Sequence, residues 1–61
     1  MKKYSIKTVD GNRFDIETDK DVMMQLRTAV RSGASFIIID TNDCTKAFNI
    51  GNIVSVTERK E

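Results

Sequence analysis

The stretch Phe36-Ile37-Ile38-Ile39 decides how the rest of the chain must be arranged. This apolar run lies between Gly33-Ala34-Ser35 and a polar turn, so it is too short for a helix and has the β-branched composition of a strand. In a strand, Phe36 and Ile38 point to one face and Ile37 and Ile39 to the other, so both faces need an apolar cover. A chain of 61 residues supplies one such cover more readily than two. The stretch therefore points to a partner.

The composition leaves oligomerisation as the remaining way to stabilise so small a domain. A domain of this size buries only about 60% of the surface that its unfolded chain exposes. Disulfides or metals often compensate. However, the single cysteine, Cys44, excludes an internal disulfide, and without histidine no zinc site of ordinary ligand number forms. We therefore expect no metal and no cofactor.

The charge pattern and the start of the chain indicate a location and exclude some partners. Ten basic and nine acidic residues give a net charge of +1, which is typical neither of a nucleic-acid-binding surface nor of an acidic DNA mimic. A polar strand follows the basic Met1-Lys2-Lys3, where a signal peptide needs an apolar run. No segment approaches the ~20 apolar residues of a membrane span. Together with a lone thiol, these features predict a soluble, cytoplasmic protein.

Residues 4–18 alternate polar and apolar side chains around Asp10-Gly11-Asn12, which predicts a β-hairpin. A three-residue loop over this turn sets Ile6 opposite Ile16 and keeps one face of the hairpin apolar. A two-residue loop instead sets Ile6 opposite a charged residue. We therefore expect the three-residue loop, with Asn12 in the left-handed conformation.

Residues 18–32 are the helix candidate. Thr18 is a suitable N-cap, and Gly33 is a suitable left-handed residue after the last turn. At about 100° per residue, Met24 lies opposite the apolar stripe, either as an isolated surface residue or as part of a contact patch with Arg31. The stripe itself contains Val22, Met23, Leu26, Ala29 and Val30.

A second hairpin follows over residues 36–50, and two loop lengths compete. A three-residue loop over Asn42-Asp43-Cys44 pairs Ile38 with Phe48 and gives one continuous apolar face. A two-residue loop shifts every pair by one position. We expect the three-residue loop, then a tight turn and a last strand over residues 53–58.

The predicted order is β-β-α-β-β-β, a single α+β domain over residues 1–61 with an ordered core of about 4–58. We expect an antiparallel sheet, or a partly closed small barrel, with the helix on one face. Ile37 and Ile39 then lie on the other face and, with Met24, form an oligomer interface. The alternative is that long neighbouring side chains shield them. The face under the helix carries Ile6, Phe14, Ile16, Phe36, Ile38, Phe48 and Ile50.

Catalytic residues are not evident, and we expect no enzymatic activity. Without histidine the commonest general base is missing, and serine or cysteine nucleophiles lack their usual partner. Cys44 is interpreted as an incidental turn residue. The segment Asp40-Thr41-Asn42-Asp43 has part of a calcium-loop pattern, but the glycine and the terminal glutamate are absent, so a polar turn is the simpler interpretation.

Four basic residues are candidates for binding an anion. Arg27 and Arg31 lie one helical turn apart, and Arg13 and Lys46 can reach from strands, so a subunit junction could hold a small phosphorylated molecule of the nucleotide type. The alternative is that the two helical arginines are solvated and complement the helix dipole. Nucleic acid is not an expected partner, because the phenylalanines are needed in the core and Tyr4 alone is left to stack on a base.

The spacing of the apolar residues and the segment Asn49-Ile50-Gly51-Asn52-Ile53-Val54-Ser55 resemble small phage and prophage proteins of Gram-positive bacteria. The resemblance covers nearly the whole chain and carries no catalytic residues. It implies a host-takeover or anti-defence factor that binds a host protein or sequesters a nucleotide signal within an oligomer.

Two functional hypotheses follow. The first is a non-enzymatic interaction module, a homo-oligomer that binds or regulates a host protein. The second is a ligand-binding protein that sequesters a small phosphorylated molecule at subunit junctions. A ligand that binds the folded state raises its thermal stability, so a panel of nucleotides separates the two hypotheses.

Overall fold

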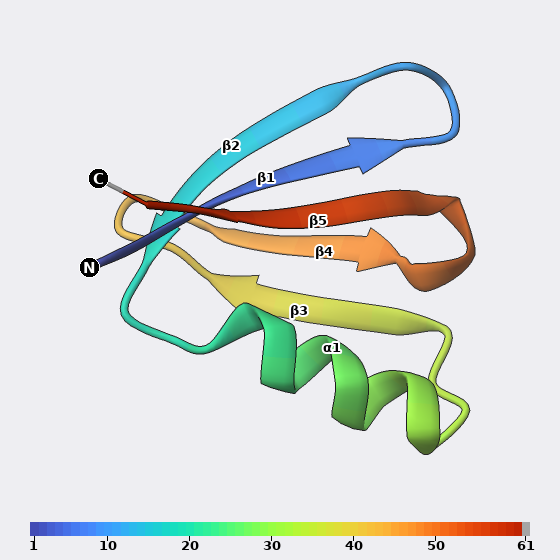
Figure 1. The fold of residues 1–61 in the computed structure, drawn as a ribbon. Coiled ribbons are helices and arrows are strands. Elements are labelled where there is room, and N and C mark those ends of the chain that lie inside the picture. Colours follow the sequence, from blue (N-terminus) through green and yellow to red (C-terminus); the bar gives the residue numbers. More distant parts are fainter. Residues whose placement is uncertain (61) are drawn as a thin grey trace.

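The computed structural model describes residues 1–60, which form five strands and one α-helix (Figure 1). The predicted α+β class and the order β-β-α-β-β-β are confirmed. A short 3-10 turn, η1, joins the last two strands. The elements are β1 (Lys2–Thr8), β2 (Arg13–Thr18), α1 (Val22–Arg31), β3 (Phe36–Asp40), β4 (Thr45–Asn49), η1 (Ile50–Asn52) and β5 (Ile53–Arg59).

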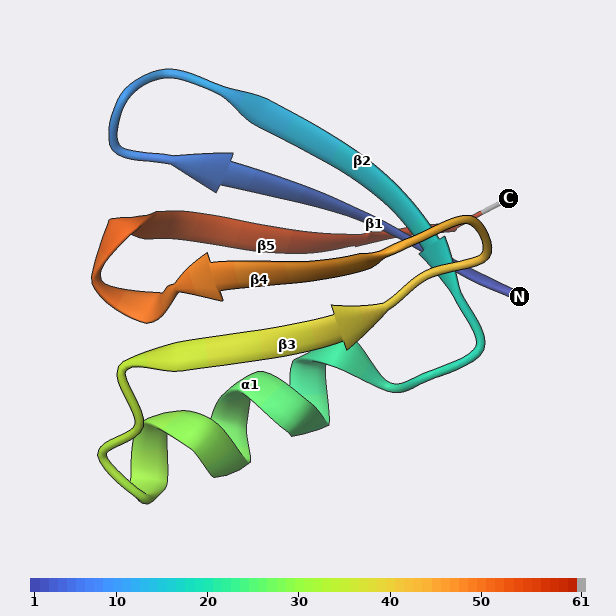
Figure 2. The same ribbon diagram turned by 180° about the vertical axis from the view of Figure 1, so that it is seen from behind.

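The strands divide into two antiparallel sheets that do not close into a barrel. One sheet has the strand order β2-β1-β5, and the other is the β3-β4 hairpin. In both views α1 runs alongside β3, at the edge that β4 does not use (Figure 1 and Figure 2). There the Gln25 side chain donates a hydrogen bond to the Ile38 carbonyl. The helix therefore protects an edge that would otherwise be open to pairing with another strand.

A single hydrophobic core lies between the two sheets and the start of the helix. Its buried members are Tyr4, Ile6, Ile16, Val22, Ile37, Ile39 and Phe48. The phenol of Tyr4 accepts a hydrogen bond from the Val22 amide and donates one to the Lys20 carbonyl. Because a buried hydroxyl needs such partners, this tyrosine also fixes the start of α1 against β1.

The first hairpin has a three-residue loop, but the loop is Val9-Asp10-Gly11. Ile6 lies opposite Phe14 and not opposite Ile16, so the predicted register is wrong by two positions on the partner strand. A shift of two keeps every side chain on its predicted face, so Ile6 and Ile16 stay in the core. Tyr4, which was expected to be free for stacking, is fully buried there. The left-handed residue is Gly11, with φ of 87°, and not Asn12. Glycine has no Cβ and takes this conformation without a steric penalty.

The helix begins later than predicted, because Thr18 still belongs to β2. The Thr18 side chain is buried, and its hydroxyl donates to the Asp40 carbonyl at 2.6 Å, which ties β2 to the end of β3. Asp21 is the N-cap instead, and its carboxylate accepts from the Met24 amide at 3.0 Å. Gly33 follows the helix with φ of 74°, in the left-handed conformation that was predicted for it.

The second hairpin has the two-residue loop Asn42-Asp43 and not the predicted three-residue loop. Ile37 pairs with Phe48, where Ile38 was expected. Thr41 closes the turn, since its amide donates to the Cys44 carbonyl at 2.8 Å and its hydroxyl accepts from the Cys44 amide at 3.2 Å. These local hydrogen bonds outweigh the continuous apolar pairing on which the longer loop was predicted.

A shift of one residue exchanges the two faces of β3. Ile37 and Ile39, predicted at an oligomer interface, are instead 3% and 1% exposed in the core of a single protomer. Phe36 and Ile38, predicted under the helix, are 61% and 59% exposed. The interface assignment of Ile37 and Ile39 is therefore wrong, and the uncovered face of the strand is the opposite one.

Candidate functional site

The outer face of the β3-β4 hairpin carries three exposed apolar side chains, which we call the outer patch: Phe36, Ile38 and Ala47. Ile38 and Ala47 face each other across the hairpin, and Phe36 is opposite Asn49. Large apolar residues are common on surfaces when they are scattered, whereas Phe36 and Ile38 are neighbours on one strand face and form a continuous apolar patch.

The exposed side of α1 brings two of the predicted basic residues together. Arg27 and Arg31 line a shallow groove with Met23, Met24 and Val30. Neither guanidinium forms an ion pair with any residue from 1 to 60. Met24 is 54% exposed, as predicted, but Met23 and Val30 of the predicted apolar stripe are also exposed, at 44% and 57%. This groove presents two cations beside flexible apolar side chains.

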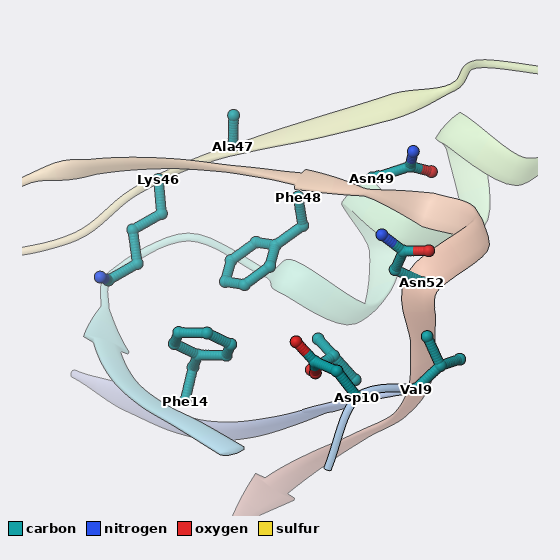
Figure 3. Close-up of a pocket in the computed structure, with 9 residues that line it drawn as sticks. Val9, Asp10, Phe14, Lys46, Ala47, Phe48, Asn49 and Asn52 are labelled. Atoms are coloured by element: carbon teal, nitrogen blue, oxygen red, sulfur yellow. The ribbon is translucent and has the colours of Figure 1, made fainter. Parts of the chain in front are cut away.

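A hollow of about 350 Å³ opens between the two sheets (Figure 3). We call it the inter-sheet hollow. Its walls come from the β1-β2 loop, β2, β4 and η1. The principal lining residues are Val9, Asp10, Phe14, Lys46, Phe48 and Asn52. The rings of Phe14 and Phe48 meet edge to face, with their centroids 5.4 Å apart.

Charged and polar groups stand at the two ends of the inter-sheet hollow. Figure 3 shows Lys46 at one end and Asp10 and Asn52 at the other, with the aromatic rings of Phe14 and Phe48 between them. The Lys46 ammonium lies 6.0 Å from the centroid of the Phe14 ring, which is within reach of a cation-π contact. The hollow thus has an apolar middle and opposite charges at its ends.

Hydrogen bonds within the β1-β2 loop hold the Asp10 side chain in place. Its carboxylate accepts hydrogen bonds from the Thr8 hydroxyl and from the backbone and side-chain nitrogens of Asn12. These bonds, that from Thr8 above all, lower the pKa of Asp10 below its ordinary value. The Val9 amide donates to the Asn52 carbonyl at 2.8 Å and so holds the loop against η1.

The four predicted anion-binding residues lie at three separate places in one protomer. Arg27 and Arg31 line the helix groove, and Lys46 lines the inter-sheet hollow. Arg13 lines a third hollow, and its guanidinium is 3.1 Å from the carboxylate of Asp15. A pocket built from all four would therefore need more than one protomer.

The turn of the second hairpin has an ordinary polar structure. The Thr41 hydroxyl and the Cys44 thiol lower the pKa of Asp43 by hydrogen bonding to its carboxylate. Cys44 is exposed. In the described part of the chain, no three histidine, cysteine, aspartate or glutamate side chains come together in a group that could hold a metal ion. The helix of this part also lacks the length and apolar character needed to cross a membrane.

The sequence pointed to Lys46 but not to the other residues of the inter-sheet hollow. Phe14 and Phe48 were assigned to the core, and Asn52 to a tight turn. A Thr-x-Asp-x-Asn spacing around Asp10 was the available local signal, because such residues close loops with their own side chains. That signal locates the loop but does not reveal the strand that faces it.

Comparisons with known proteins do not extend this assignment: no protein-family model matches the chain, and no curated protein or solved structure is similar to it. The resemblance to phage proteins stays a prediction.

Proposed function

We propose that the protein is a non-enzymatic interaction module that assembles as a homo-oligomer and binds or regulates a host protein. The observation that carries the proposal is the outward orientation of Phe36 and Ile38. One face of β3 is buried by its own chain, whereas the two large side chains on the other face are more than half exposed. The predicted need for a partner thus remains, although it moves from Ile37 and Ile39 to their neighbours.

The energy available from the outer patch favours its use as the centre of a larger interface. Full burial of a phenylalanine or isoleucine side chain contributes about 1.5–3 kcal/mol. Because Phe36 and Ile38 are a little over half exposed, burying the rest of each side chain would contribute roughly 1–2 kcal/mol. A two-fold contact uses each residue twice and gains roughly 4–8 kcal/mol, against an association cost of at least about 4 kcal/mol. Residues around the patch must therefore add to a stable contact.

A second copy of the chain suits this surface for a geometric reason. Two-fold symmetry places identical faces together, so the outer patch of one copy can meet the outer patch of the other. Stacked sheets pack about 10 Å apart, which brings Phe36 and Ile38 of both copies into one layer. A pair of hairpins stacked in this way leaves the inter-sheet hollow and the helix groove available for other partners.

The second candidate function is the sequestration of a small phosphorylated molecule at a subunit junction. One observation favours it: Arg27 and Arg31 lie together on an exposed groove, and neither forms an ion pair within the described chain, although Asp21 also lines the groove. Phosphate oxygens would complement such a pair. A phage-type role and a cytoplasmic location belong to the same proposal, and the exposed thiol of Cys44 is compatible with a reducing compartment.

The test of the main proposal is the solution mass, measured by light scattering behind a sizing column. We expect an oligomer for the wild type and a folded monomer for Ile38→Lys, because the lysine places a charge in the centre of the contact. Val54→Lys is the matched control, since Val54 is also exposed but lies on the other sheet. Circular dichroism verifies that both variants fold. A monomeric wild type at high concentration, or equal dissociation by both variants, contradicts the proposal.

A further inference from the structure

We propose that the inter-sheet hollow binds a small planar aromatic anion that carries an N–H donor at the end opposite its negative charge. This inference goes beyond the interaction module and depends on a different surface. Phe36 and Ile38 lie on the outward face of the β3-β4 hairpin, whereas the hollow opens on its inward face. Ala47 of the outer patch borders the hollow, but its side chain points away from the two rings (Figure 3). The two proposals therefore succeed or fail separately.

The middle of the hollow suits a planar ring. Phe48 is buried at its base, and Phe14 is only partly buried, so the edge-to-face pair leaves aromatic surface open to the hollow. Aromatic rings favour offset or edge-to-face contact with a further ring. The volume of about 350 Å³ is at the lower end of the range of small-molecule sites, which limits the aromatic part of the ligand to one or two rings.

Lys46 supplies the charge that selects an anion. It is the one charged residue on the inward face of the β3-β4 hairpin, where Ile37, Ile39 and Phe48 are the other members. No carboxylate in the described residues forms an ion pair with its ammonium, although its charge contributes slightly to the lowered pKa of Asp43. A partly buried cation that contacts an aromatic face gains from an anionic ligand placed beside it.

The other end of the hollow presents hydrogen-bond acceptors. Asp10 points its carboxylate toward the space between Phe14 and Asn52 (Figure 3). The carboxylate oxygens have lone pairs beyond the hydrogen bonds that close the loop, so they can accept from a ligand N–H. The Asn52 side-chain amide forms no hydrogen bond with residues 1–60 and can adopt either orientation. A ring with an exocyclic amino group therefore matches this end.

The test is a titration of the ¹⁵N-labelled full-length protein, followed by amide chemical shifts. The probes are 4-aminobenzoate and adenosine 5′-monophosphate. Each has an aromatic ring, a negative charge and an amino group, but one is a carboxylate and the other is a nucleotide. Benzoate lacks the donor, and aniline lacks the charge. We expect saturable shifts at the amides of Val9, Phe48 and Asn52, strongest for the complete probes. Saturation by only one of them identifies the source of the ligand.

Charge variants distinguish binding at the hollow from non-specific electrostatic attraction of an anion to the protein. Lys46→Met should weaken binding by about three- to tenfold, as expected for one partly solvated ion pair. Lys46→Arg should retain most of the affinity. Lys20→Met removes the same charge from an exposed position outside the hollow and should change nothing. Amide spectra of the free variants verify that each is folded.

Three results overturn the proposal: no saturable shifts with any probe, shifts that map away from the hollow, or equal weakening by Lys20→Met and Lys46→Met. The Ile38→Lys variant should bind the probes as the wild type does, because its substitution lies on the outward face. Loss of binding in a folded Ile38→Lys protein would show that the site needs the assembled oligomer, and it would contradict a site within one protomer.

Discussion

Replacing Ile39 by valine and, separately, Ile38 by valine removes the same methylene group from two adjacent positions of β3. Ile39 is 1% exposed and contacts the core, whereas Ile38 is 59% exposed. A buried isoleucine-to-valine change costs about 0.5–1.5 kcal/mol, while a surface change usually stays within about 0.5 kcal/mol. We therefore expect Ile39→Val to lower the free energy of unfolding by about 1 kcal/mol and Ile38→Val to have little effect.

The assay is thermal and chemical denaturation at a protein concentration low enough to keep the chain monomeric. For a domain of this size, 1 kcal/mol corresponds to a fall in Tm of about 4–8 °C. The conservative change is chosen because alanine at position 39 would cost about 2–5 kcal/mol and could unfold so small a domain. A larger effect at Ile38 than at Ile39 would refute the two-residue loop and restore the opposite register.

Two further predictions concern the turns and the response to acid. Gly11→Ala should destabilise the protein by about 1–2 kcal/mol, because position 11 has φ of 87° although space around it is open; an unchanged Tm would contradict the loop structure. Hydrogen bonds hold the pKa of Asp10, Asp15 and Asp43 below the ordinary value, with Thr8, Ser5 and Thr41 as the respective main donors. Their contribution to stability should be complete above the pKa of an unfolded aspartate, about 3.9, and should be lost as the pH falls through the lowered values. Denaturation midpoints should stay flat between about pH 5 and 7, since the chain has no histidine, and a rise in stability on acidification would contradict this assignment.

The order of the elements and the first hairpin were predictable from local patterns. Alternating side chains on either side of Asp10-Gly11-Asn12 specify two strands, and the error of two positions in their register left Ile6 and Ile16 in the core. The helix was also predictable from its apolar period. Its N-cap was not, because Thr18 and Asp21 are both good capping residues and the hydrogen bond from Thr18 to a distant carbonyl decides between them.

The inter-sheet hollow could be predicted only in part. Lys46 was recognised as a candidate cation, yet its neighbour Phe14 is far away in the sequence and belongs to the other sheet. The amide of Val9 brings Asn52 to the same site through a hydrogen bond between two loops. Such a site exists only after both sheets pack, so no spacing along the chain reveals it.

By itself the sequence determined that a strand of four apolar residues would leave one face without a cover from so short a chain. It did not determine which face, because a continuous apolar run has no alternation and both registers place large side chains on each side. The tertiary structure decided this, because Phe48 meets Phe14 across the core. With the local turn that Thr41 and Cys44 close, this contact fixes the register, so Ile37 points inward and Ile38 outward.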